Sequence, residues 1–226
     1  MEETIAEVAK AVSSGMKRVK LKIQPGHDIE VVKSVREAFP GVLLGVDANA
    51  AYSQKDFAVF EKMDQCNLMF VEQPFAPEAL EAHAALAKKI VSPICLDESI
   101  RDLDSCKKAL SMKSCSMVNI KPARIGSYTE TIQIHDYCAS NGIPLFGGGR
   151  METGLGKIWN AHIFSLRGFS LPADFTPPLE YFSQDLVTPS PTVASGEYRI
   201  PKGIGIGCSI NESALNQYTR EHIVFE

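Results

Sequence analysis

Val42-Leu43-Leu44-Gly45-Val46-Asp47 is a short apolar run that ends in a single carboxylate. Because the run does not alternate between apolar and polar residues, it is typical of a strand covered on both faces in a parallel sheet. Similar runs recur before and after it, each followed by a polar residue and a turn. Together they predict seven strands, at residues 18–23, 42–47, 68–72, 94–97, 116–121, 143–147 and 168–172.

Helical patterns separate these runs. Ile5, Val8 and Val12 fall on one face of a helix, and Ser53 with Asp56 has the spacing of a capping box that begins another. Alternating strands and helices predict an α/β fold, either a doubly wound sheet or a barrel. The polar residues at the strand ends favour the barrel, because its strand ends converge on one mouth.

We therefore predict a (β/α)7β-type TIM barrel at residues 1–180 and a C-terminal segment at 181–226 made of extended chain and turns. A closed barrel has eight strands, whereas seven are visible and a helix precedes the first. We accordingly expect the barrel to be N-terminally truncated, with its first strand missing.

Composition excludes several classes of protein. The chain has 226 residues, 45% of them hydrophobic, and a formal net charge of −4, so it offers no basic surface for nucleic acid. Its sequence contains no apolar run long enough for a membrane span and no basic secretion signal, which predicts a cytoplasmic protein. The six cysteines form no CxxC pair, so we expect reduced, structural thiols.

Five ionisable residues occupy matching positions on five consecutive predicted strands. They lie at intervals of 25, 25, 25 and 24 residues: Lys22, Asp47, Glu72, Asp97 and Lys121. Three carboxylates at one barrel mouth would repel one another unless a cation neutralised them. With no histidine or cysteine beside them, they favour Mg²⁺ or Mn²⁺ over Zn²⁺.

The two lysines flank this carboxylate set. Lys22 and Lys121 could therefore face a metal-bound substrate from opposite sides, which suits proton transfer. A lysine is a poor base at neutral pH, but a nearby divalent ion and the second cation Lys20 would lower the pKa of Lys22.

Six motifs resemble the o-succinylbenzoate synthase and N-succinylamino acid racemase branch of the enolase superfamily. They are Lys20-Leu21-Lys22, Asp47-Ala48-Asn49, Glu72-Gln73-Pro74, Asp97-Glu98-Ser99, Asn119-Ile120-Lys121-Pro122 and Gly149-Arg150-Met151-Glu152-Thr153-Gly154. The resemblance covers nearly the whole chain.

The resemblance implies a Mg²⁺ site from the three carboxylates and an acid/base pair of lysines. It further implies that Lys20 and Asn49 contact a small carboxylate substrate, that Glu98 supports the Lys121 side, and that Gly149, Arg150 and Met151 line the pocket. The implied reaction is a dehydration to o-succinylbenzoate in menaquinone biosynthesis.

Other functions stay open at the level of sequence. The resemblance also includes N-acylamino acid racemases, muconate cycloisomerases and dipeptide epimerases, although residues 171–174 hold one Asp where the epimerases usually have Asp-x-Asp. A Schiff-base aldolase using Lys121 belongs to another class, as does an inactive fragment or binding remnant. We expect low activity from the chain alone, because the family's capping domain, on which residues 181–226 would pack, is absent. Association into a homo-oligomer also stays open.

Overall fold

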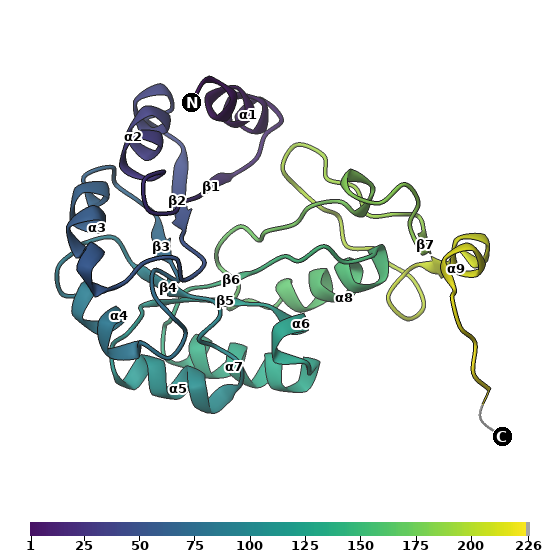
Figure 1. Cartoon of the computed structure of the whole chain (residues 1–226). Coiled ribbons are helices and arrows are strands. Elements are labelled where there is room, and N and C mark those ends of the chain that lie inside the picture. Colours follow the sequence, from purple (N-terminus) through teal and green to yellow (C-terminus); the bar gives the residue numbers. More distant parts are fainter. Residues whose placement is uncertain (225–226) are drawn as a thin grey trace.

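The computed structural model of the protein describes residues 1–224. Six short strands form one parallel sheet in which each strand pairs with the next one along the chain. The strands are β1 (Arg18–Lys22), β2 (Leu43–Asp47), β3 (Phe70–Glu72), β4 (Ile94–Leu96), β5 (Met117–Ile120) and β6 (Leu145–Gly147). The sheet is curled, with helices along its outer face (Figure 1). This α/β arrangement confirms the barrel-type fold predicted from the sequence.

Helices follow the strands as the sequence predicts. Before the third helical pattern, Ser53 and Asp56 form the expected capping box at a 3-10 turn, η1 (Gln54–Asp56). The remaining helices of this part of the chain are α1 (Glu2–Ser13), α2 (Ile29–Ala38), α3 (Phe57–Asp64), α4 (Leu80–Leu86), α5 (Leu103–Ser111), α6 (Pro122–Ile125), α7 (Tyr128–Ser140) and α8 (Gly154–Phe164).

The core has two parts, one on each face of the curled sheet. The main cluster lies between the sheet and the helices, and includes Val32, Leu44 and Phe60, all with 0% exposure. A smaller cluster lies inside the curl, where the rings of Phe70 and Phe146 stack with centroids 5.2 Å apart. Because alternate residues of a strand share a face, Phe70 places Glu72 on the inner face, nearer the C-terminal end.

The seventh predicted strand, residues 168–172, is not a regular strand. It makes a single parallel bridge, between Phe169 and Leu145 of β6. Backbone hydrogen bonds from the N–H groups of Leu171 and Asp174 to β6 flank Pro172, whose carbonyl oxygen accepts a 2.8 Å hydrogen bond from Arg18 Nε of β1. Side chains thus connect the first strand to this segment where backbone pairing does not.

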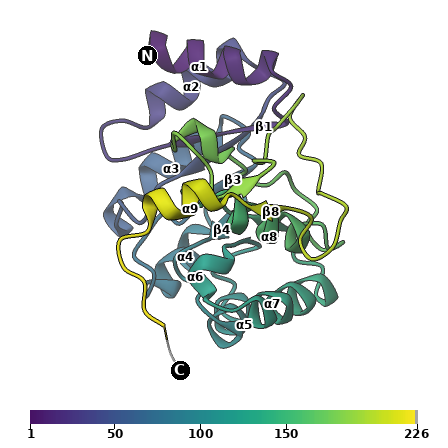
Figure 2. The same ribbon diagram turned by 90° about the vertical axis from the view of Figure 1, so that its right-hand side faces the viewer.

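Residues 181–224 are mostly irregular and lie to one side of the barrel in Figure 1, and therefore in front of it in Figure 2. They also contain elements that the sequence did not predict: an antiparallel pair, β7 (Val187–Thr188) and β8 (Ser209–Ile210), and helix α9 (Glu212–Tyr218). A second 3-10 turn, η2 (Pro178–Glu180), precedes them.

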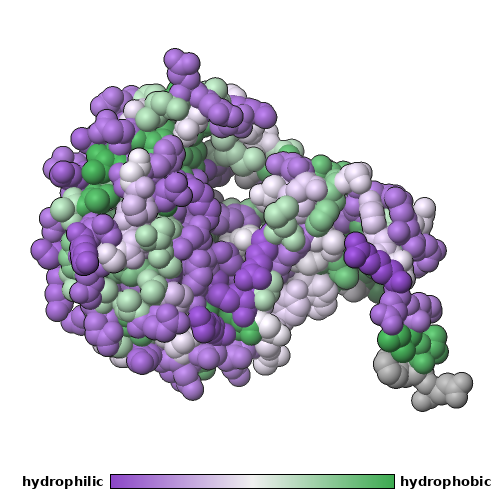
Figure 3. All heavy atoms as spheres, in the orientation of Figure 1, coloured by the Kyte–Doolittle hydropathy of each residue, from purple (hydrophilic) through white to green (hydrophobic). Residues whose placement is uncertain are grey.

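The C-terminal segment rests against the start of the barrel. A Cβ on Gly196 would lie 2.0 Å from the carbonyl oxygen of Gly15, so only glycine permits this close approach. Figure 3 shows the molecule hollowed between barrel and segment, with hydrophilic residues over much of the visible surface. Within residues 1–224, no helix is long and apolar enough to cross a membrane.

Candidate active site

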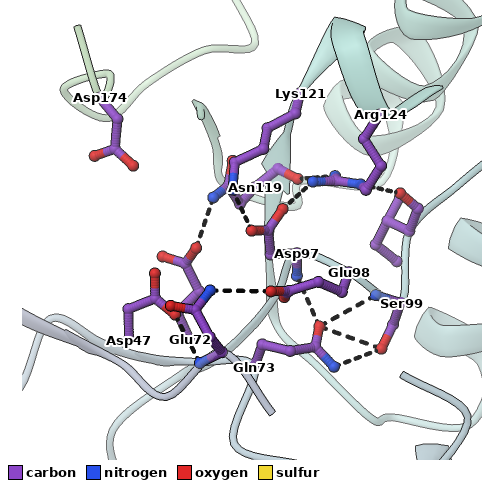
Figure 4. A network of polar contacts seen from close by, with 12 residues as sticks. Asp47, Glu72, Gln73, Asp97, Glu98, Ser99, Asn119, Lys121, Arg124 and Asp174 are labelled. Carbon is purple, nitrogen blue, oxygen red and sulfur yellow. Dashed lines mark hydrogen bonds and ion pairs between the residues drawn. The ribbon is translucent and has the colours of Figure 1, made fainter. Parts of the chain in front are cut away.

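The five ionisable residues predicted from the sequence meet at the C-terminal end of the sheet. Lys22 is in register with Asp47 on the next strand, and Asp47 is in register with Glu72. Asp97 and Lys121 directly follow β4 and β5. Figure 4 shows the three carboxylates and Lys121 gathered in one polar network. The strand register therefore produces the convergence that the sequence spacing predicted.

Asp47 binds two lysines from the neighbouring strand. Its Oδ2 lies 2.6 Å from Lys22 Nζ and 3.3 Å from Lys20 Nζ, and its Oδ1 accepts a 3.1 Å hydrogen bond from the backbone N–H of Asn49. Burial acts to raise the pKa of Asp47, but Lys20, Lys22 and the Asn49 N–H together bring it below its usual value. Asp47 is therefore a buried, ionised carboxylate.

Glu72 also has a fully buried side chain. It accepts hydrogen bonds from Lys20 Nζ at 3.0 Å and from Asn119 Nδ2 at 2.7 Å. Burial raises the pKa of Glu72, and the negative charges of Asp47 and Asp174 act in the same direction, so Lys20 offsets the shift only in part. Additional positive charge beside Glu72 would favour its ionised form.

The ammonium group of Lys20 contacts three carboxylates. Besides Asp47 and Glu72, its ammonium lies 2.6 Å from Asp174 Oδ2. Burial lowers the pKa of Lys20, but Glu72, Asp174 and Asp47 outweigh burial and raise it above the usual value. Lys20, predicted to contact substrate, is therefore a permanent cation of the carboxylate network in this structure.

Asp97 is bound by two cations at the other end of the row. Lys121 and Arg124 each contact one of its oxygens, and the three side chains are at most 15% exposed. Arg124 also donates to the carbonyl oxygens of Ile100 at 2.6 Å and Asn119 at 2.7 Å. Burial lowers the pKa of Arg124 to about 10, which leaves it charged at neutral pH.

Asn49 and Glu98 lie beside Lys22. Asn49 Oδ1 accepts a hydrogen bond from Lys22 Nζ at 2.5 Å, and its Nδ2 donates to Glu98 Oε1 at 3.0 Å. The resemblance placed Glu98 on the Lys121 side, but the structure gives it Asn49 as its partner. Asn49, whose amide makes this contact, has a left-handed backbone with φ of 41°.

The residues after β6 form one wall of the mouth. Gly148 packs so closely against Lys121 that a Cβ there would lie 2.6 Å from Lys121 Cε, and a Cβ on Gly149 would lie 2.5 Å from the carbonyl oxygen of Asp174. Arg150 and Met151 are exposed, Met151 to 73%. Of the three predicted pocket residues, Gly149 is thus packed at the mouth and the other two lie at the surface.

A buried hydrogen-bond network centred on Gln73 supports the backbone at Asp97. Gln73 Oε1 accepts from the backbone N–H groups of Asp97 at 3.0 Å and Ser99 at 3.2 Å, and Gln73 Nε2 donates to Ser99 Oγ at 2.8 Å. His83 lies 3.5 Å from Gln73 Nε2 and accepts a 3.3 Å hydrogen bond from the N–H of Phe75. This network fixes the backbone that carries Asp97.

The sequence did not predict a role for three residues that contact the charged row: Asn119, Arg124 and Asp174. Asn119 stands two residues before Lys121 and so shares its strand face, a signal that the period of two could have given. Arg124 follows Lys121 by three residues, across the start of α6. Asp174 reaches the site from beyond β6, and no local spacing connects it to Lys20.

The donor chemistry of the site fits a hard divalent cation. Asp47, Glu72 and Asp97 are buried carboxylates on three adjacent strands, and Asn119 Oδ1 is a further buried oxygen without a hydrogen-bond partner. In this structure, the positive charge beside these carboxylates comes from the side chains of Lys20, Lys22, Lys121 and Arg124. Accordingly, among residues 1–224 no three carboxylate, histidine or cysteine side chains are oriented around a common metal position.

Comparison with protein families decides the membership of the chain. The family model described as Enolase C-terminal domain-like matches residues 3–214. The chain belongs to this enolase family. Enzymes of the enolase superfamily generally use a divalent metal ion, typically Mg²⁺.

Relatives within the enolase superfamily include enzymes of two activities. The chain is 40% identical to an o-succinylbenzoate synthase of Geobacillus kaustophilus, and 40% identical to an N-succinylamino acid racemase of Thermus thermophilus, in each case over 97% of this chain and 59% of the relative. The structure of an enolase-superfamily member from Listeria innocua superposes with a TM-score of 0.94 at 37% identity, over 97% of this chain and 59% of that one. The chain thus spans about 60% of the length of these relatives.

Proposed function

We propose that this chain carries the catalytic barrel of an o-succinylbenzoate synthase-type carbon–oxygen lyase, which removes a proton α to a carboxylate and then eliminates water. The observation that carries the proposal is the position of Lys22 and Lys121 at opposite ends of a row of three buried carboxylates. Synthases from several bacteria at 35–40% identity support this activity.

In this proposal Asp47, Glu72 and Asp97 hold Mg²⁺, with Mn²⁺ as a substitute. The bound ion would stabilise the negative charge that develops on the substrate carboxylate as the α-proton leaves. Glu72, whose pKa burial raises, would then ionise fully, because positive charge replaces part of the lost hydration.

The side chains of the site then divide the remaining work. Lys22, with 66% of its side chain exposed, removes the α-proton when its ammonium has lost a proton to solvent. Lys121 stays beside Asp97 and stabilises the intermediate by its charge. Lys20 and Asn49 bind the substrate carboxylate, and Gly149, Arg150 and Met151 border the pocket.

Racemisation of N-succinylamino acids is the second candidate, because racemases of Thermus thermophilus and an Amycolatopsis species are each 40% identical to the chain. The same two lysines would then act on opposite faces of the substrate. We also propose that the barrel unit ends near residue 180 and that residues 181–226 form a separate packing segment.

The direct test measures both reactions with Mg²⁺ present. Dehydration is followed by the absorbance of the aromatic product, and racemisation by exchange of the α-proton in deuterated solvent. We expect dehydration to be the faster reaction. A protein that binds Mg²⁺ and catalyses neither reaction nor α-proton exchange would contradict the proposal.

Metal binding is tested separately by calorimetric titration with Mg²⁺. We expect one saturable site that Asp47→Asn and Asp97→Asn weaken at least tenfold, because each substitution removes a charged ligand. Glu61→Gln is the matched control, since Glu61 lies on the surface in an ion pair with Lys89. Binding that is equal in all four proteins would place the ion elsewhere.

A further inference from the structure

Two buried thiols face each other in the helical layer, in contacts that the proposed reaction does not use. Cys106 of α5 and Cys138 of α7 are both 0% exposed, and their Sγ atoms lie 3.6 Å apart. The two helices lie side by side in both ribbon views (Figures 1 and 2). We propose that Cys106 and Cys138 are a redox-active pair that hydrogen peroxide converts into an intramolecular disulfide.

The geometry requires only a local movement. A disulfide has a sulfur–sulfur length of about 2.05 Å, so the two atoms must approach by about 1.5 Å. Rotation about the Cα–Cβ bond of each cysteine moves its sulfur by such distances. Helices α5 and α7 pack together, and the N–H of Leu103 in α5 donates to Glu130 Oε1 of α7 at 3.2 Å.

No other pair of sulfur atoms within residues 1–224 lies at hydrogen-bonding distance, although all six cysteines are free. The contact also distinguishes the two thiols chemically. The hydrogen bond with Cys138 lowers the pKa of Cys106, whereas the same hydrogen bond and burial raise the pKa of Cys138. Since the thiolate is the reactive form, Cys106 is the nucleophile of the pair.

A cavity lies near the pair, at the end of the two helices, although neither Cys106 nor Cys138 lines it. It has a volume of about 570 Å³ and is lined by Leu110, which lies one helical turn beyond Cys106, and by Tyr137, which precedes Cys138. Cys115 lines the same cavity. Hydrogen peroxide is little larger than water and fits in this cavity, from which a local movement of the two helices would open the remaining path to the buried sulfurs.

The chemistry balances with hydrogen peroxide as the oxidant. The Cys106 thiolate attacks one peroxide oxygen, the O–O bond breaks, and the products are a Cys106 sulfenic acid and hydroxide. Cys138 sulfur then attacks the Cys106 sulfur, the S–O bond breaks, and the oxygen leaves as water with the Cys138 proton. In total, two thiols lose two electrons and two protons, and one peroxide becomes two waters.

The cross-link would clamp the helices that flank β5. The chain between Cys106 and Cys138 includes β5 and α6, and therefore Asn119, Lys121 and Arg124 of the candidate site. A disulfide that closes a loop of this length restricts the unfolded chain and favours the folded protein. We therefore expect the oxidised protein to melt several degrees higher than the reduced protein.

Peptide mapping tests the proposal on the unmodified chain. The reduced protein, freed of reductant, is exposed to hydrogen peroxide in native buffer, then unfolded, alkylated and digested. We expect a peptide that links Cys106 to Cys138, with the corresponding loss of two hydrogen masses from the intact protein. Cys106→Ser and Cys138→Ala each remove this link, whereas Cys66→Ser, a substitution of another buried cysteine, retains it.

Several results would overturn the proposal. One is full alkylation of Cys106 and Cys138 under conditions that oxidise the partly exposed Cys208. Another is a link from Cys106 to Cys115, which would make Cys138 a spectator. A third is a link that forms only in urea, because it would show that the folded protein does not bring the sulfurs together. Mapping of the unsubstituted protein decides among these outcomes even where a variant does not fold.

Discussion

The two lysine corners of the candidate site differ in exposure and in support. At one corner, Lys22 has 66% of its side chain exposed and contacts Asp47 and Asn49. At the other, Lys121 is 15% exposed, and its partner Asp97 is also bound by the buried Arg124. The Lys22 corner is therefore open to water, whereas the Lys121 corner is enclosed and fixed by a second cation.

This difference supports the separate tasks that we propose for two residues of the same type. A general base must exchange its proton with solvent and reach the substrate, which an exposed lysine at the end of a strand can do. A residue that stabilises charge acts best when it is held in place and shielded from water. The first corner therefore suits proton abstraction and the second suits electrostatic stabilisation.

The largest predicted effect is the loss of the exposed lysine. Lys22→Met is expected to lower the rate of α-proton exchange by between about a hundredfold and ten thousandfold, because the base is removed. Lys121→Met is expected to slow dehydration but retain measurable exchange. Exchange is followed by NMR in deuterated buffer, with Lys89→Met as a surface control. Equal loss of exchange in both variants would show that the corners do not differ in role.

The second prediction concerns the free energy of unfolding. Here the larger effect is expected at the Lys121 corner and the smaller one at the Lys22 corner. Arg124→Gln is expected to lower the free energy of unfolding by about 4 kcal/mol, because it removes one cation from a buried carboxylate. Lys22→Gln is expected to cost less than about 1 kcal/mol, because the Lys22 side chain is largely exposed and Lys20 still contacts the buried Asp47.

Urea denaturation of the two variants and the parent protein, without added metal, measures these values. Arg101→Gln is the control for a guanidinium on the surface, since Arg101 pairs with Glu78 and both are mostly exposed. A smaller loss for Arg124→Gln than for Lys22→Gln would show that the Asp97 corner is not the rigid one.

The third prediction concerns the network beneath the Asp97 corner. Burial lowers the pKa of His83 to about 4, below the value of about 6.5 in an unfolded chain. The unfolded state therefore takes up a proton first on acidification. Stability should be independent of His83 above pH of about 6.5 and fall by about 3 kcal/mol between there and pH 4.

Denaturation curves at a series of pH values test whether stability falls on acidification as predicted. His83→Gln is expected to flatten the slope between about pH 6.5 and 4, at some cost in stability at neutral pH. His27, which is exposed, provides the matched substitution His27→Gln, which should leave the slope unchanged. A slope that survives His83→Gln would assign the acid sensitivity to other groups.

The two corners also differ in how far the sequence could predict them. Apolar runs and their spacing were sufficient for the sheet order and for the convergence of Lys22, Asp47, Glu72, Asp97 and Lys121, because strand register transmits sequence spacing directly into space. The partners of individual side chains are harder to predict from the sequence, because a carboxylate can turn to any cation within reach.

Three contacts in the structure were not predicted from the sequence. Asp174 binds Lys20 from a distant segment, and Pro172 accepts a hydrogen bond from Arg18 in place of regular pairing. Glu98 accepts a hydrogen bond from Asn49, 49 residues earlier in the chain, which the sequence did not signal. Each depends on long-range packing rather than on local pattern.

The smallest predicted effect tests where Glu98 belongs. If Glu98 belongs to the Lys22 corner, Glu98→Ala and Asn49→Ala should be coupled, because they share the 3.0 Å hydrogen bond between Asn49 Nδ2 and Glu98 Oε1. A double-mutant cycle in urea is expected to give a coupling energy of about 1 kcal/mol for this pair. The parallel cycle of Glu98→Ala with Lys121→Ala should give a value near zero.

These two cycles discriminate between the positions of Glu98 suggested by the family resemblance and by the structure. Coupling to Lys121 alone would place Glu98 with the enclosed corner, and the exposed corner would then lack any acidic support besides Asp47. Coupling to Asn49 alone would mean that Glu98 orients the amide that binds Lys22 Nζ at 2.5 Å. In that case the more exposed lysine is itself positioned by a hydrogen-bonded chain, through Asn49 to Glu98, so that exposure gives it access to solvent without leaving it free in orientation.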